Sequence, residues 1–161
     1  MNARLAEFLA AHLARYEVVA HPEGFTAQEQ AAATHVSGWS WAKVIGVKSE
    51  EGYALAVLPA CCVIDLGRLR GLIGRGEVSL ATTEELLRLA PGCDPGAIPP
   101  LGRLFGVPTF VDHRLVNQRE ITMPAGDART AIRMRAKEYL RLAAPRIGYF
   151  AVHEALAAPG R

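Results

Sequence analysis

The chain has 161 residues, half of them hydrophobic, and a formal net charge of +2 at pH 7. A chain of this length and composition can bury a sizeable core without disulfides or a structural metal, and we expect one domain over residues 1–161. The charge is too small for a general nucleic-acid-binding domain, and the apolar runs are too short to span a bilayer.

The N-terminal stretch and the cysteines indicate where the protein works. Residues 2–16 interleave apolar and charged side chains, a pattern typical of an amphipathic helix and not of a signal sequence. Cys61, Cys62 and Cys93 form neither a disulfide framework nor a C-x-x-C metal pair. We therefore expect a cytoplasmic protein, monomeric and not associated with a membrane.

The first half of the chain predicts a helix and a hairpin. After a short strand at residues 16–20, Thr26–Glu29 has the pattern of a capping box that starts a helix reaching about Val36. Apolar, β-rich runs at residues 41–48 and 53–59 are separated by Ser-Glu-Glu-Gly, which indicates a hairpin with one of the longer loops. We expect these two strands at the centre of a sheet.

Further elements follow in mixed order. A helix is predicted at residues 65–73 and a short strand at 77–80, and a second capping box, Thr82–Glu85, starts a helix that stops before Pro91. Strands are then expected at 107–112 and 120–123.

The stretch from residue 127 to residue 143 is ambiguous, since it accepts either a strand at 131–135 followed by a helix at 136–143 or one continuous helix. Short strands among helices, without strict alternation, predict an α+β fold: a mixed, curled, barrel-like sheet surrounded by helices.

Lys43 is the most informative single residue. It lies within a strand whose two faces are both apolar, so that the strand is expected to be largely buried, and a buried ammonium group would need an anion or a polar cleft. It could anchor a phosphate or a carbonyl oxygen, or it could lie at a sheet edge with its stem on apolar surface and its head in water. Lys48, at the end of the strand, is expected to be solvated.

The loop from Pro95 to Gly102 has too many prolines and glycines for a helix or a strand, yet its Ile98 and Leu101 are apolar. It could be an ordinary connector. Alternatively, its glycines permit close approach of a ligand, and its prolines hold main-chain groups in place to grip a small amino-acid moiety.

The usual hydrolytic and metal signatures are missing. The five histidines show no H-E-x-x-H spacing, and no G-x-S-x-G elbow is present. His21 and His113 are interpreted as surface or capping residues, and the Cys61–Cys62 pair as partly buried filler. No metal and no cofactor is expected. A basic series could contact phosphates, but its default interpretation is a solvated face: Arg129, Arg133, Arg135, Lys137, Arg141 and Arg146.

An ordered set of motifs, from about Leu5 to Pro145, resembles the YbaK family and the related deacylases associated with prolyl-tRNA synthetase. The motifs are Thr26–Glu29 opening a helix, Ala42-Lys43-Val44, the run from Leu55 to Ala60, the Gly96–Gly102 loop, and Pro124-Ala125-Gly126. Residues 147–161 lie beyond the resemblance and are expected to form a tail that is frayed at residues 158–160.

The resemblance implies an editing hydrolase that acts in trans on the acceptor end of mischarged aminoacyl-tRNA, commonly tRNA for proline, and a synthetase could be a further partner. On this basis Lys43, Gly96, Ile98, Pro100 and Gly102 are candidate catalytic residues, with Lys43 contacting the terminal adenosine or its phosphate. Thr26, Pro99 and Gly126 are candidate substrate-binding residues. Where some relatives have serine, this chain has Pro124 before its Ala-Gly pair.

An editing site of this kind needs shape more than reactive side chains, because a second pocket can destroy the small products that a synthetase discriminates poorly. A positioned water, main-chain donors and the substrate's own ribose hydroxyl could suffice for an activated ester. Two alternatives stay open: a non-catalytic module that binds tRNA or a synthetase, and a hydrolase of another small ester or thioester.

Overall fold

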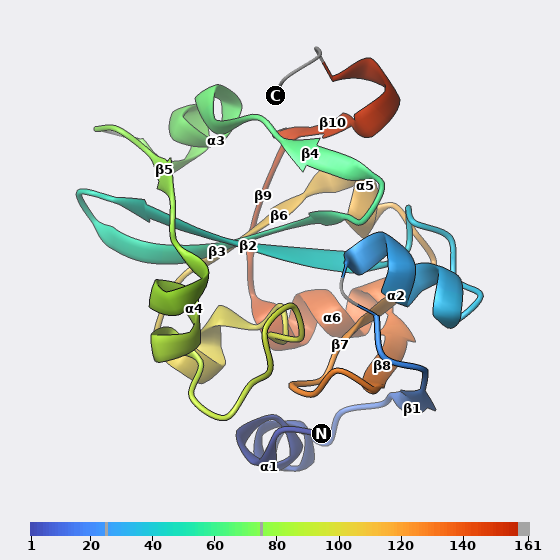
Figure 1. Ribbon diagram of the computed structural model, residues 1–161. Coiled ribbons are helices and arrows are strands. Elements are labelled where there is room, and N and C mark those ends of the chain that lie inside the picture. The colour runs from blue at the N-terminus through green and yellow to red at the C-terminus, as the bar shows by residue number, and fades with distance from the viewer. Residues whose placement is uncertain (25, 75, 158–161) are drawn as a thin grey trace.

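The computed structural model describes residues 1–24, 26–74 and 76–157. Its helices are α1 (Ala3–Ala11), α2 (Ala27–Ala33), α3 (Leu66–Ile73), α4 (Thr83–Leu89), η1 (Gly102–Phe105), α5 (His113–Val116), α6 (Ala136–Ala143) and η2 (Glu154–Leu156). Its strands are β1 (Glu17–Ala20), β2 (Ala42–Ser49), β3 (Gly52–Pro59), β4 (Cys62–Ile64), β5 (Ser79–Leu80), β6 (Thr109–Asp112), β7 (Glu120–Pro124), β8 (Thr130–Arg135), β9 (Arg146–Gly148) and β10 (Ala151–His153). The predicted α+β class is confirmed (Figure 1).

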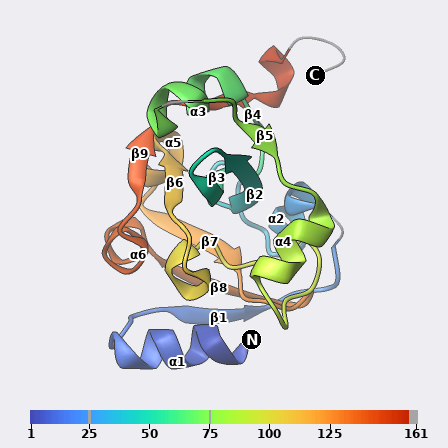
Figure 2. The same cartoon turned by 90° about the vertical axis from the view of Figure 1, so that its left-hand side faces the viewer.

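The main sheet has the order β5-β2-β3-β6-β9, with parallel pairing of β3 to β6 and of β6 to β9. The predicted hairpin strands β2 and β3 lie at its centre, as expected. Figure 2 views them end-on, with β6 and β9 to one side and β7, β8 and β1 below. The sheet is mixed and curled. Among the described strands, β5 and β9 are its two edges and do not pair with each other, so the sheet does not close into a barrel.

The loop of the β2–β3 hairpin is shorter than predicted. Ser49 pairs with Gly52, so that only Glu50 and Glu51 form the turn. Gly52 makes this tight return possible because its φ of 111° lies in a region that L side chains rarely adopt. The four-residue polar run therefore belongs partly to the strands.

Two smaller sheets, β1-β8-β7 and β10-β4, complete the β structure. In the stretch that the sequence left ambiguous, Thr130–Arg135 forms the strand β8, which pairs with β7 and β1. The helix α6 starts only at Ala136. The continuous-helix alternative is wrong, because strand pairing places Ala131 and Ile132 in the core.

Two helices end earlier than predicted. α1 stops at Ala11, before a turn in which Leu13 has a φ of 50°, and α2 stops at Ala33, before His35 with a φ of 55°. The start of α2 is as predicted, because the Thr26 hydroxyl accepts a hydrogen bond from the Glu29 N–H at 3.1 Å. Residues 82–85 form a complete capping box at the start of α4.

The core is divided by the β2–β3 ribbon. One face contributes Ala42 and Val57 to a cluster with α1, α6 and the β7–β8 strands. The other contributes Val47, Ala56 and Leu58 to a cluster with α3. Since successive strand residues face opposite ways, the nearly continuous apolar sequence of these strands is explained by burial on both faces.

Part of the expected tail is built into the sheets. β9 extends the main sheet, and β10 pairs with β4. The fully buried carboxylate of Asp112 accepts hydrogen bonds from the main-chain N–H groups of Phe150 and Ala151, at 2.9 and 2.8 Å. The end at 158–161, including the expected frayed residues, lies outside the described residues. No helix in the described part of the chain is long and apolar enough to cross a bilayer.

Candidate functional site

A cavity of about 300 Å³ lies beside the edge of β2. It is lined by Ala27, Trp41, Ala42, Lys43, Val44, Ile45, Gly46, Leu80, Ala81, Thr83, Leu86, Leu87, Pro95, Gly96, Ile98 and Pro124. These residues come from β2, β5, α4, the start of α2, the end of β7 and the loop before η1. The volume lies at the lower end of the range for small-ligand sites, and the wall is predominantly apolar, as such sites usually are.

The edge of β2 is open where it borders the cavity. On this edge the Gly46 carbonyl accepts from the Ala81 N–H at 2.8 Å, and the Ser40 carbonyl accepts from the Thr122 N–H at 2.9 Å. Because strand residues alternate, the main-chain groups of Val44 face the same edge. They have no hydrogen-bond partner outside the strand among the described residues. This stretch therefore offers a free N–H and a free carbonyl to a ligand.

Gly46 explains how α4 forms the opposite wall. A Cβ at this position would lie 2.9 Å from the Leu86 Cδ1 and 3.2 Å from the Ala81 Cβ. The missing side chain therefore lets Leu86 approach the strand closely. Leu86 and Leu87 of α4, together with Leu80 of β5, line this side of the cavity. Sequence reasoning missed this wall, because apolar residues on short elements do not reveal which cavity they line.

Lys43 borders the cavity from β2, and its ammonium group reaches β4, where it donates a hydrogen bond to the Cys62 carbonyl. Burial lowers the pKa of Lys43, and the nearby Cys62, Glu154 and Cys61 oppose this shift. The side chain shares a face with Ile45, across from Leu58. Of the two possibilities for Lys43, the structure therefore favours a partly buried ammonium group over a head that is free in water. Lys48, which was expected to be solvated, has a side chain that is 43% exposed, and it also pairs with Glu85 at 3.0 Å.

The front of the Pro95–Gly102 loop faces the cavity. Gly96 has a φ of 75°, and Ile98 is 3% exposed. The Gln30 side chain of α2 donates to the Gly96 carbonyl at 3.4 Å, and the Gly126 N–H donates to the Ala97 carbonyl at 2.8 Å. The N–H groups of Gly96 and Ile98 have no acceptor among the described residues. The loop is therefore braced from two sides while two donors stay available.

The back of the loop is packed against the core. The Pro100 carbonyl accepts from the buried Tyr139 hydroxyl at 2.8 Å, and the Pro99 carbonyl accepts from the Leu101 N–H at 2.8 Å. A Cβ on Gly102 would lie 2.4 Å from the Val107 carbonyl oxygen. These contacts fix the path of the loop.

The predicted site residues therefore divide into two groups. Lys43, Gly96 and Ile98 border the cavity, whereas five others do not: Thr26, Pro99, Pro100, Gly102 and Gly126. Thr26 is exposed and caps α2 directly before Ala27, which does line the cavity.

Few reactive groups reach the cavity. Of its lining residues, only Lys43 and Thr83 carry polar side-chain groups apart from Trp41, whose indole N–H is buried without a partner in the described part of the protein. His21 lies edge-on to Trp41, with 6.0 Å between the ring centres, and is itself buried, so the expected surface position is wrong for it. Residues 1–24, 26–74 and 76–157 contain no group of His, Cys, Asp and Glu suited to a metal ion. The cavity can hold and orient a small ligand through shape and main-chain groups.

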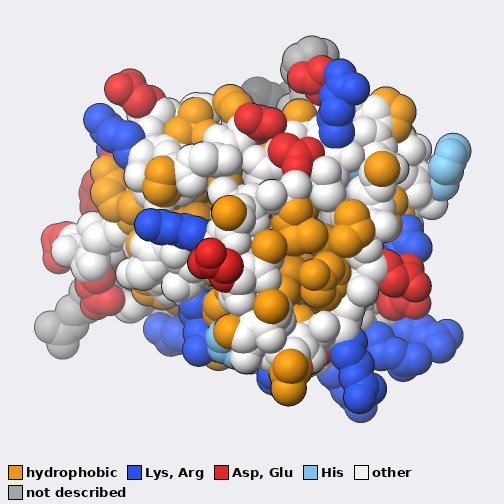
Figure 3. All heavy atoms as spheres, turned by 90° about the horizontal axis from the view of Figure 1, so that it is seen from below, with side chains coloured by type: hydrophobic (Ala, Val, Ile, Leu, Met, Phe, Trp, Pro, Cys, Tyr) orange, Lys and Arg blue, Asp and Glu red, His pale blue; other side chains and the backbone are white. Residues whose placement is uncertain are grey.

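The predicted basic series is spread over the surface. Arg129 pairs with Glu23 at 3.7 Å and Arg133 with Glu17 at 3.8 Å. Three other members of the series, Arg135, Lys137 and Arg141, line a separate open hollow together with Leu13, Arg15 and Glu138. Seen from below in Figure 3, apolar side chains gather in the middle of the face, and Lys and Arg side chains gather toward its margins.

Comparisons with known proteins give the fold and the family. Residues 21–142 match the sequence model of the aminoacyl-tRNA editing domain. The hypothetical protein APE2540 has a similar crystal structure, with a TM-score of 0.82 and 19% identity over 92% of this chain and 99% of that one. A protein whose proposed role is that of a trans-editing enzyme for prolyl-tRNA synthetase is 26% identical, with a TM-score of 0.79 over 94% of this chain and 99% of its own.

A third similar structure, from a study that grafted linear epitopes onto scaffold proteins, is 26% identical, with a TM-score of 0.81 over 92% of this chain and 96% of its own. The search of curated proteins found no match. The family match covers most of the chain and includes β2, α4 and the loop that surround the cavity. The resemblance seen in the sequence is confirmed, and the chain belongs to the family of aminoacyl-tRNA editing domains.

Proposed function

We propose that this protein hydrolyses, in trans, the ester that links a wrongly attached small amino acid to tRNA for proline or a related tRNA. The observation that carries the proposal is the cavity of about 300 Å³ between the open edge of β2 and the braced loop, bordered by Lys43. The family match and the similarity to a protein proposed to edit in trans for prolyl-tRNA synthetase support it.

In the proposed complex, Lys43 binds the terminal nucleotide of the acceptor end through its phosphate. Its ammonium group is partly buried and its present partner is one neutral carbonyl, that of Cys62, so an anionic phosphate oxygen would be a stronger acceptor. The aminoacyl group then enters the cavity between Ile98 and the α4 leucines.

The reaction needs little side-chain chemistry. A water molecule attacks the ester carbonyl carbon, the bond to the ribose oxygen breaks, and the products are the free amino acid and uncharged tRNA. The free N–H groups of Gly96 and Ile98 are the candidates to stabilise the oxygen that gains negative charge. In the proposed step, the neighbouring ribose hydroxyl of the substrate accepts the proton of the attacking water and passes its own proton to the departing ribose oxygen. The substrate takes this role because no His, Asp or Glu is among the residues that line the cavity in the described structure.

The character of the wall bears on which amino acid is removed. Among the described residues that line the cavity, Thr83 is the only one besides Lys43 with a side-chain hydroxyl or charge. A serine or threonine side chain would lose hydrogen bonds to water on entry, whereas alanine would not. We therefore propose alanine as the preferred aminoacyl group.

The test is deacylation of Ala-, Ser-, Thr-, Cys- and Pro-charged tRNA by wild-type protein, by Lys43→Ala and by Lys48→Ala. We expect alanine to be released fastest and Lys43→Ala to lower kcat/KM about 10- to 150-fold, as loss of a charged hydrogen bond does. Lys48 lies on the same strand but pairs with Glu85, so its replacement is the control and should change kcat/KM less than about threefold.

Two results would contradict the proposal. Absence of hydrolysis by folded wild-type protein would indicate a binding module, and equal turnover of a free alanine ester would indicate a general esterase. A conservative change of His21 that abolished activity would show that a side-chain base is required and would overturn the assignment of this role to the substrate.

A further inference from the structure

Trp39 is a large aromatic residue at the surface, whereas Trp41, two residues further along the chain, is fully buried. Its indole ring is stacked on the imidazole of His153, with 5.1 Å between ring centres and an interplanar angle of 25°. Trp39 is 37% exposed, whereas Trp41 is 0% exposed. The two rings come from distant parts of the chain, the turn before β2 and the end of β10.

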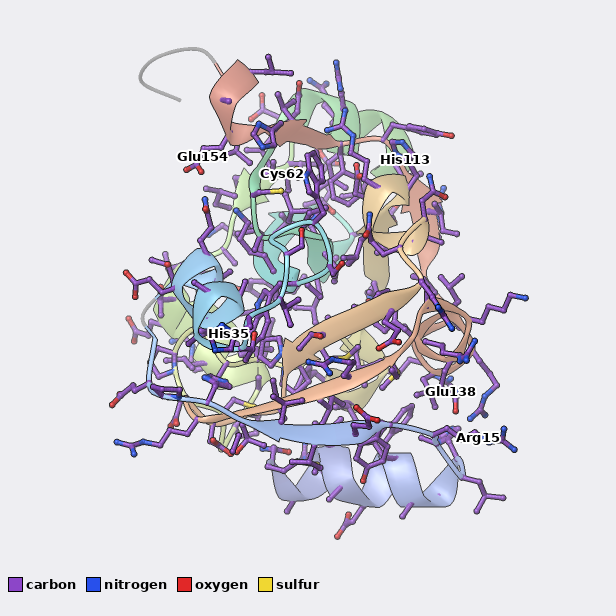
Figure 4. All side chains as sticks on the ribbon, turned by 90° about the vertical axis from the view of Figure 1, so that its right-hand side faces the viewer. Arg15, His35, Cys62, His113, Glu138 and Glu154 are labelled. Carbon is purple, nitrogen blue, oxygen red and sulfur yellow. The ribbon has the colours of Figure 1, made fainter. Side chains whose placement is uncertain are left out.

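This stacked pair is connected to Lys43 through Cys62. His153 pairs directly with Cys62 in the β10–β4 ribbon, and the Cys62 carbonyl is the acceptor for the Lys43 ammonium group. The next residue, Glu154, donates its N–H to the Cys61 carbonyl at 3.0 Å. Figure 4 shows Cys62 and Glu154 at the same end of the molecule. The Trp39–His153 pair therefore lies beside the residue that binds the Lys43 ammonium group, and Lys43 itself borders the cavity.

The pair is held in position from both sides. The main-chain N–H of Trp39 donates to the Ser37 hydroxyl at 3.2 Å. A Cβ on Gly38 would lie 3.1 Å from the Cys61 Cβ, so this turn packs closely against the residue that precedes β4. On the other side, Gln28 of α2 donates a hydrogen bond to Glu154 beside His153. An aromatic face fixed in this way loses little conformational entropy on binding a ligand.

We propose that the Trp39–His153 pair is a stacking platform for an unpaired nucleobase of the RNA acceptor end, next to the phosphate that Lys43 binds. The inference deepens the proposed function and rests on it for the identity of the RNA. Single-stranded RNA is recognised by stacking of splayed bases on aromatic side chains beside cationic groups, and both are combined here. A protein partner would call for a wider apolar patch than one indole ring.

The two tryptophans make a direct test possible. An uncharged RNA minihelix ending in single-stranded CCA should quench the fluorescence of exposed Trp39, because base stacking on the indole quenches it, while buried Trp41 stays unaffected. The same minihelix without the three unpaired nucleotides should quench little. Trp39→Phe should abolish the quenching but keep RNA affinity, measured by anisotropy of labelled RNA, within about threefold, since phenylalanine also stacks.

Trp39→Ala should weaken binding of the CCA minihelix by about 5- to 150-fold, the range expected for loss of one base–aromatic stack. The matched control is Tyr149→Ala, because Tyr149 is also an exposed aromatic residue beside a histidine: its ring centre lies 3.9 Å from that of His113, with the two rings tilted by 37°. It should leave affinity unchanged. Unchanged affinity in Trp39→Ala, an equal loss in Tyr149→Ala, or absence of quenching by the CCA end would each overturn the proposal.

The outcomes separate this inference from the proposed function. Quenching by the CCA end without deacylation of any charged tRNA would support the platform and refute the editing reaction. Deacylation by wild-type protein with unchanged KM in Trp39→Ala would support the reaction and refute the platform. Because a stacking residue contributes to binding and not to the chemical step, Trp39→Ala is expected to raise KM and leave kcat unchanged.

Discussion

Gly102 was a candidate catalytic residue, and its contacts indicate a packing role behind the loop. Its own N–H donates to the Thr109 hydroxyl at 2.8 Å. A Cβ would lie 2.4 Å from the Val107 carbonyl oxygen and 3.0 Å from that of Pro108. Because these neighbours are backbone atoms, they cannot move aside as a flexible side chain can.

We expect Gly102→Ala to lower the free energy of unfolding by about 3 kcal/mol, at the upper end of the cost of overpacking. Gly106→Ala is the control: Gly106 has a φ of 70°, but a Cβ at this position would have no described atom within 4 Å, so only backbone strain of about 1–2 kcal/mol applies. Urea denaturation measures both. An equal or smaller effect in Gly102→Ala would show that the loop yields at this point.

At the scale of elements, Glu85 links α4 to the sheet by hydrogen bonds. This residue completes the capping box with Thr82 and also accepts hydrogen bonds from Tyr53 and Lys48. These contacts, with that of Tyr53 the largest, lower the pKa of Glu85 from 4.5 to about 2. The helix that forms one wall of the cavity is therefore held to β2 and β3 by an ionised carboxylate.

The depressed pKa predicts the direction of acid sensitivity. Because Glu85 binds its proton more weakly in the folded state, its stabilising effect is fully present above the unfolded pKa of about 4.5 and is lost as pH falls toward about 2. Between about pH 6 and pH 3, the urea midpoint should therefore fall more in wild type than in Glu85→Gln. Glu84→Gln, at an exposed neighbour paired with Arg88 at 3.8 Å, should behave as wild type. Parallel curves for wild type and Glu85→Gln would contradict this assignment.

At the scale of the whole molecule, the segment after α6 completes the fold beyond the family match, which ends at residue 142. Phe150 is fully buried in the α3 cluster, although the adjacent Tyr149 is 69% exposed. The main-chain N–H groups of Phe150 and Ala151 also satisfy the buried Asp112 carboxylate. The same segment then places His153 opposite Cys62, whose carbonyl accepts a hydrogen bond from the Lys43 ammonium group.

We therefore expect Phe150→Ala to destabilise the protein by about 3–5 kcal/mol, the usual cost of removing a buried phenylalanine side chain. Tyr149→Ala, one residue earlier, should cost less than about 1 kcal/mol because its side chain is mostly in water. Thermal unfolding followed by circular dichroism would compare the two. A small effect at Phe150 would mean that this segment is not part of the cooperative fold.

The amino-acid sequence by itself determined most elements, the central hairpin, the place of Lys43 within an apolar strand and the editing family, because periodicity, helix caps and ordered motifs can be read along the chain. Tertiary structure alone decided that β8 is a strand, since its alternative as a helix has similar local propensity and only pairing with β1 and β7 selects between them. It also decided which loop residues border the cavity and which support them from behind. The walls formed by α4 and β5, and the meeting of Trp39 with His153, join residues far apart in the chain, and such contacts depend on packing that no short segment encodes.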